Sequence, residues 1–183
     1  FEIDMKDGLA VAEQFHIEHR CINLSDTRET LVGALKEVTG DLKEASLNNI
    51  APRLRMTTLY AIAANEGRLV AGTGNRSEAY VGYFTKWGDG SHDFNPIADL
   101  TVTEIYEFLR FLKAPEAIIT KAPSAGLAEG QTDEGEMGVT YAELDAYLSG
   151  GSIAPEKQAK IDAMHAASQH KRDPIVAYTP KAE

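Results

Sequence analysis

The chain has 183 residues, 43% of them apolar and 25% charged, with a formal net charge of -10 at pH 7. These proportions are ordinary for one globular domain, and the acidic balance argues against a nucleic-acid or anionic-membrane partner, because phosphate backbones are bound by clustered Lys and Arg. The single cysteine, Cys21, excludes an internal disulfide framework, and no apolar run is long enough to cross a bilayer. We therefore expect a cytoplasmic protein.

The first half of the chain is predicted to form helices that alternate with two short strands. Apolar residues at helical spacing predict helices over 5–16, from Asp26 to Val38 and over 50–66. The capping-box pattern at Asp26 opens the second of these, and Gly67 ends the third. Apolar stretches predict strands at 17–24 and 68–73, and residues 39–49 read as a polar connection.

The second half contains further helix starts. Thr101 and Thr140 each begin a capping-box pattern that opens a helix, the first reaching Leu112 and the second ending at Gly150. Pro155 is placed to open a last helix that ends near residue 170, and the segment 121–138, rich in Gly, Ala and acids, reads as a loop. This alternation favours an α/β fold with a parallel sheet, although two strands are few for one.

A ligand site is indicated at residues 72–96, where glycines, charges and aromatic residues are mixed. A strand that ends at Thr73 and turns through Gly74 into a helix would present backbone amides where ligands of open α/β sheets bind. Gly72 and Gly74 would permit a close approach of the backbone, and Glu78 could hold a hard cation such as Mg2+. A plain turn is the alternative interpretation of the same residues.

Several longer motifs, in order, resemble those of NAD synthetases. They are RLRM at 53–56, LVAGTGNRSE at 69–78, GYFTKWGDG at 82–90, KAPSAGL at 121–127, QTDE at 131–134 and HKR at 170–172. The resemblance covers nearly the whole chain from Met5 onward. It implies a Rossmann-like parallel sheet with flanking helices, of the adenine nucleotide alpha hydrolase-like, ATP pyrophosphatase type.

The same resemblance implies ATP-dependent amidation of deamido-NAD with ammonia to NAD, through an adenylated intermediate, with release of AMP and pyrophosphate. It implies a homodimer and no covalent protein nucleophile. Matched by position, it assigns ATP contacts to Thr73 and Ser124, a Mg2+ ligand to Glu78, and deamido-NAD contacts to Arg53, Lys86, Asp93, His170 and Lys171.

Ordinary structural roles are the alternatives for these residues. Lys86 and Asp93 could pair with one another across the turn at 88–90, and His170 and Lys171 could complement a helix dipole. Gln131, Asp133 and Glu134 are expected to shape a lid rather than contact substrate.

Two departures from the family pattern stand out. The phosphate loop Ser-Gly-Gly-x-Asp-Ser is absent, so we expect residues 1–183 to be a single synthetase domain without its N-terminal quarter. Val102 occupies a position where the family usually has a lysine, so that either another cation serves or ATP binding is weakened. A non-catalytic relative that keeps a dimeric dinucleotide-binding scaffold is therefore the alternative function.

Overall fold

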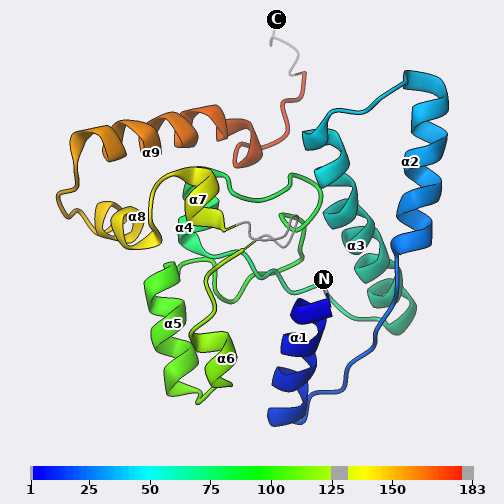
Figure 1. Ribbon diagram of the computed structural model, residues 1–183, viewed down its shortest axis with the longest axis horizontal. Coiled ribbons are helices and arrows are strands. Elements are labelled where there is room, and N and C mark those ends of the chain that lie inside the picture. The colour runs from blue at the N-terminus through cyan, green and yellow to red at the C-terminus, as the bar shows by residue number, and fades with distance from the viewer. Residues whose placement is uncertain (1, 125–131, 179–183) are drawn as a thin grey trace, which may run out of the picture.

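The computed structural model describes residues 2–124 and 132–178, and these form nine α-helices and one 3₁₀ helix (Figure 1). None of the described helices is long and apolar enough to cross a membrane. In chain order the elements are α1 (Glu2–Gln14), α2 (Ser25–Thr39), α3 (Glu44–Glu66), α4 (Arg76–Val81), α5 (Val102–Phe111), α6 (Glu116–Ile119), α7 (Asp133–Met137), α8 (Tyr141–Leu148), α9 (Pro155–Ala167) and η1 (Gln169–Lys171).

The helices predicted from apolar spacing are confirmed, but several boundaries are wrong. α3 begins at Glu44, six residues before the predicted start, because a first turn on the protein surface needs no apolar residues. α2 begins without a side-chain cap, so the predicted capping box at Asp26 does not form. Two short helices, α6 and α7, were not predicted, and α7 lies inside the predicted loop.

The predicted sheet is not seen among the described residues. Residues 17–24 have no regular structure, and Ile17 and Ile22 are half exposed, so their alternation reflects no strand pairing. The predicted strand at 68–73 is reduced to one parallel bridge between Ala71 and Phe94. The Gly72 amide donates to the Phe94 carbonyl at 2.7 Å beside this bridge.

One apolar core lies where α4, α5, α7, α8 and α9 meet. Leu144 and Ile161 are its most deeply buried large residues, and Val102 at the start of α5 belongs to it. α2 packs against α3 on the other side of the molecule, at the right of Figure 1. The core therefore supports α4 and α5, whereas α2 and α3 keep exposed apolar residues such as Val38 and Leu59.

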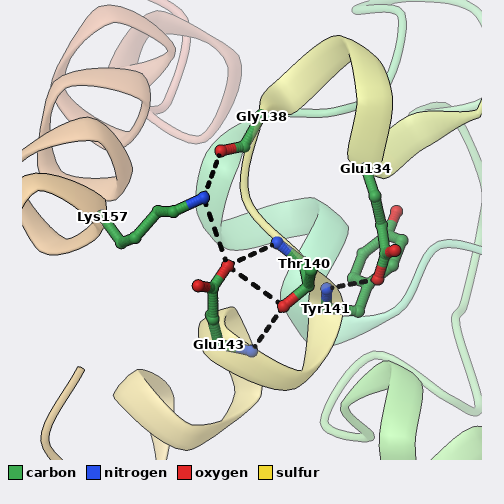
Figure 2. A network of polar contacts seen from close by, with 6 residues as sticks. All are labelled: Glu134, Gly138, Thr140, Tyr141, Glu143 and Lys157. Carbon is green, nitrogen blue, oxygen red and sulfur yellow. Dashed lines mark hydrogen bonds and ion pairs between the residues drawn. The ribbon is translucent and has the colours of Figure 1, made fainter. Parts of the chain in front are cut away.

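Helix caps fix the elements around this core, as the start of α8 shows in Figure 2. The Thr140 amide donates to Glu143 at 2.8 Å, and the Glu143 amide donates to the Thr140 hydroxyl at 3.1 Å, which confirms the predicted capping box. The bonds that the Thr140 amide and hydroxyl donate to the Glu143 carboxylate hold the pKa of Glu143 below its ordinary value. Lys157 of α9 donates to the Gly138 carbonyl at 3.0 Å and so joins α9 to the end of α7.

Candidate functional site

The start of α4 is fixed by a capping box. The side chain of Asn75 accepts from the Glu78 amide at 2.9 Å, and the Glu78 carboxylate accepts from the Asn75 amide at the same distance. The helix thus begins just after Gly74, close to where the sequence predicted it. The reciprocal bonds hold the Glu78 carboxylate at the first turn of the helix.

Three residues predicted for ATP and Mg2+ line one cavity of about 350 Å³. Thr73 and Glu78 come from the turn and first helical turn after the parallel bridge, and Ser124 comes from the segment that follows α6. Val102, at the first position of α5, and Lys121 also line it. Residues far apart in the sequence, such as Thr73 and Ser124, therefore meet at one concave site.

The electrostatics of the cavity favour a cation. The pKa of Glu78 is raised to about 7, chiefly by burial and also by the nearby Asp133 and Asp89, against the opposing bonds from Asn75. A desolvated carboxylate of this kind gains most from a cation that restores its charged form.

The described residues contain no cluster of three acidic, His or Cys side chains that could hold a metal ion. Glu78 fits a single Mg2+ ligand, because Mg2+ is usually held by one or two carboxylates, with phosphate and water oxygens completing its shell.

Asp133 was expected to shape a lid, and the structure gives it a buried place beside this site. Its side chain is 4% exposed and accepts from the Tyr141 hydroxyl at 3.0 Å. Its amide donates to the Pro123 carbonyl at 3.1 Å, which ties α7 to the cavity wall. Of the other two predicted lid residues, Glu134 accepts from the Tyr141 amide at 2.8 Å, and Gln131 lies outside the described residues.

A buried carboxylate on α8 joins the two helices that flank the cavity. Asp145 is 6% exposed and accepts from the Ser77 hydroxyl of α4. It also accepts from the Thr103 amide at 2.8 Å and the Thr103 hydroxyl at 2.7 Å. Sequence reasoning missed this residue, because nothing near residue 145 in the sequence marks its partners.

The residues predicted for deamido-NAD form a second, partly connected group. Arg53 on α3 donates to the Lys86 carbonyl at 3.3 Å, and the Lys86 ammonium donates to the His170 carbonyl. Arg53 also lines a cavity of about 360 Å³ between α2 and α3. Three of the five predicted residues are thus brought together.

Asp93 and Lys171 have structural partners in the described contacts. Asp93 accepts from the Val70 amide at 2.7 Å, beside the parallel bridge, rather than pairing with Lys86. The Lys171 ammonium donates to the Gly82 and Phe84 carbonyls, each at 2.6 Å, and burial lowers its pKa. Both residues would stabilise the walls of a substrate site.

The C-terminal turn is packed tightly against the end of α4. Arg172 donates to the Ala79 carbonyl at 3.1 Å and to the Ser168 hydroxyl at 2.8 Å. Gly82 ends α4 with a φ of 70°, and a Cβ added there would lie 2.1 Å from the Ser168 Cβ. The turn can approach this closely only because residue 82 has no side chain.

The two glycines expected to face a ligand differ in their surroundings. A Cβ on Gly72 would lie 2.6 Å from the His92 ring, so the missing side chain of this glycine serves internal packing. A Cβ on Gly74 would meet only the Glu78 carboxylate, at 3.8 Å. Gly74 is therefore the glycine that leaves the backbone accessible beside Glu78.

Comparison with known proteins relates the chain to one family. Residues 1–175 match the family model described as NAD synthase. The chain is 52% identical to the NH(3)-dependent NAD(+) synthetase of Carboxydothermus hydrogenoformans, over 92% of this chain and 70% of that protein.

Two solved structures share its fold. The NMN synthetase from Francisella tularensis is 40% identical with a TM-score of 0.92, covering 100% of this chain and 74% of that one. The NH3-dependent NAD synthetase from Campylobacter jejuni, solved in complex with the nitrate ion, is 26% identical with a TM-score of 0.75, covering 97% and 72%.

Proposed function

The chain belongs to the NAD synthase family, a ligase family of NAD biosynthesis, and we propose how its residues serve the reaction. The reaction is ATP-dependent amidation of deamido-NAD with ammonia. The curated relatives are named as synthetases, so the non-catalytic alternative is not favoured.

The observation that carries the residue assignment is the shared cavity of Thr73, Glu78 and Ser124. We place the ATP phosphates there, with the two hydroxyls as donors and the Glu78 carboxylate as a Mg2+ ligand. Bound Mg2+ would neutralise charge that moves onto the pyrophosphate leaving group. Asn75 holds the Glu78 carboxylate in place through the capping box, so this carboxylate is already oriented before Mg2+ binds.

We place deamido-NAD along the second group of residues. Arg53 and Lys86 supply positive charge, and His170 lies beside them at the C-terminal turn. Asp93 and Lys171 are the other two residues assigned to deamido-NAD, and their bonds to the Val70 amide and the Gly82 carbonyl stabilise the backbone around the site. The protein then acts by positioning the two substrates and by stabilising charge electrostatically. Both effects help a reaction between two anionic groups, the carboxylate of deamido-NAD and the α-phosphate of ATP.

A direct assay tests this function. With ATP, Mg2+, deamido-NAD and ammonia we expect NAD, AMP and pyrophosphate in equal amounts. Omitting ammonia should stop NAD formation. No pyrophosphate under any of these conditions would contradict the proposal and return the chain to the non-catalytic alternative.

A second candidate substrate is the mononucleotide, nicotinate mononucleotide. The observation in its favour is the match to an NMN synthetase over the whole of this chain with a TM-score of 0.92. The amidation chemistry is the same, and only the adenylate half of the dinucleotide would be missing. The ratio of kcat/KM for the two substrates decides between them.

We also propose a homodimer formed through α2 and α3. Leu59 is 53% exposed and Val38 is 86% exposed, which leaves apolar surface on both helices. Light scattering at micromolar concentration should give twice the mass of one chain, and Leu59→Glu should shift the protein toward monomer. A monomeric mass for the unaltered protein would refute the dimer.

Val102→Lys tests the position where the family usually carries a lysine. Val102 lines the cavity and is also 7% exposed within the core. We expect tighter ATP binding by about 1 to 3 kcal/mol, the value of one charge-assisted contact, together with some loss of stability from burying the lysine stem. Calorimetric titration with ATP and Mg2+ measures the first, and thermal unfolding the second. Unchanged affinity would show that residue 102 does not face the phosphates.

We propose an α/β fold with a Rossmann-like parallel sheet and a cytoplasmic location for this chain. The shared fold of the solved relatives supports an α/β, Rossmann-like parallel sheet, and the bridge between Ala71 and Phe94 has the parallel direction such a sheet requires. A single synthetase domain and a cytoplasmic location stay predictions.

A further inference from the structure

We propose that Lys121 supplies the cation that contacts the ATP phosphates in the cavity of Thr73, Glu78 and Ser124. This inference rests on the proposed function, because it takes that cavity to be the ATP site. It names a residue to which neither the sequence motifs nor the deamido-NAD assignments gave a role.

Charge is the first argument. A triphosphate carries several negative charges, and the cavity already contains the Glu78 carboxylate, with Asp133 close enough to raise the pKa of Glu78. Of the described residues that line the cavity, Lys121 alone carries a cationic side chain. Without it the described side chains that line the cavity would offer the polyphosphate hydroxyls, the Asn75 amide, apolar groups and an acid, and Mg2+ on Glu78 would have to balance its charge alone.

The backbone of Lys121 is held at the cavity wall. The Tyr106 hydroxyl donates to the Lys121 carbonyl at 2.6 Å, and Tyr106 itself lines the cavity from α5. α5 is fixed in turn by Asp145, which binds the Thr103 amide and hydroxyl. The position of Lys121 relative to Glu78 is therefore set by the same core that positions α4.

The ammonium of Lys121 lies where it can contact either the Asp7 carboxylate or a phosphate in the cavity. It is 2.7 Å from a carboxylate oxygen of Asp7 on α1, and the two side chains are 36% and 22% exposed. Ion pairs that reach solvent contribute little to stability, so a phosphate can take over or share this ammonium at small cost. Asp7 does not line the cavity, whereas Lys121 does.

The experiment compares two variants that break the same ion pair. Lys121→Gln removes the cation, and Asp7→Asn removes only the negative charge of the Asp7 side chain. If Lys121 contacts phosphate, Lys121→Gln should raise the KM for ATP by about tenfold or more and leave the KM for deamido-NAD nearly unchanged. Asp7→Asn should change the KM for ATP by no more than about twofold, the effect expected of an exposed pair.

Lys121→Arg keeps the charge and serves as the rescue. It should bind ATP with Mg2+ close to the unaltered protein in calorimetric titration, while Lys121→Gln binds weakly. An unchanged ATP affinity in Lys121→Gln would overturn the inference, and so would an equal loss in Asp7→Asn, since the effect would then come from the contact with α1. Unaltered protein that binds no ATP would instead overturn the proposed function, and the inference with it.

Discussion

Replacing Glu78 with Gln should lower pyrophosphate release by about a hundredfold or more while deamido-NAD still binds. Gln keeps the shape of the side chain, and its carbonyl can still accept the Asn75 amide, so α4 keeps its capping bond. The negative charge toward Mg2+ is lost, whereas Arg53 and Lys86 are untouched. Turnover measured across a Mg2+ titration should recover in part at high Mg2+, because a weakened site can be refilled by mass action.

Glu104→Gln is the matched control for that variant. Glu104 occupies the same capping-box position at the start of α5, accepting from the Thr101 amide at 2.8 Å, but it does not line the cavity. Its removal should leave turnover nearly unchanged. Equal turnover of Glu78→Gln and the unaltered protein at every Mg2+ concentration would reduce Glu78 to a helix cap.

The same pair of variants should differ in stability as pH changes. The folded protein holds the pKa of Glu78 at about 7, above its ordinary 4.5, so the unfolded chain loses this proton first as pH rises. Stability contributed by the protonated acid therefore falls between about pH 4.5 and 7. At pH 8 without Mg2+, Glu78→Gln should be more stable than the unaltered protein, by up to on the order of 3 kcal/mol.

Glu104 should show the opposite sign, because hydrogen bonds from Thr101 lower its pKa. The ionised form then stabilises the folded protein above the ordinary pKa, and Glu104→Gln should lose stability at pH 8. Thermal unfolding at pH 5 and pH 8 measures both. If Glu78→Gln melted below the unaltered protein at pH 8, the burial of Glu78 would not be costly and the electrostatic account of the cavity would be wrong.

Asp145→Ala is expected to destabilise the protein by about 3 to 5 kcal/mol. The carboxylate is nearly fully buried and accepts from Ser77 and from both the amide and the hydroxyl of Thr103. Alanine would leave the buried Ser77 hydroxyl and the part-buried donors of Thr103 without this acceptor, and the link from α8 to α4 and α5 would be lost. Urea unfolding followed by circular dichroism gives the free energy of unfolding.

Asp162→Ala provides the comparison for Asp145. Asp162 accepts from the Tyr147 hydroxyl at 2.8 Å at an exposed position, so its loss should cost well under half as much. Similar costs for the two variants would mean that the buried network does not hold α4 and α5 together.

Local sequence signals predicted the helices better than they predicted the sheet. The capping boxes at Thr101 and Thr140 formed because both partners lie within one helical turn of each other. The alternating stretch at 17–24 forms no strand, because a strand needs a neighbouring strand to pair with, and the local sequence does not predict whether one is present. α7 was missed because a five-residue helix in a Gly-rich segment shows too few turns for a periodic pattern.

The candidate site follows the same division. Motif order led to Thr73, Glu78 and Ser124, and the cavity brings these three together. Asp145 was not found, since its importance depends on Ser77 and Thr103, which lie more than forty residues away in the sequence. Lys121 opens one of the quoted motifs, but only the fold shows that it lines the same cavity as Glu78. Such contacts appear only when the core has placed the helices.

The close approach of Gly82 to Ser168 has a consequence for how this protein can vary over time. A side chain at position 82 would collide with the serine, and the left-handed backbone at 82 adds its own penalty for anything but glycine. The two positions should consequently change as a pair. Among natural variants, an asparagine at 82 should be tolerated only where 168 has shrunk to glycine, and random libraries should yield the double exchange far more often than the product of the single frequencies.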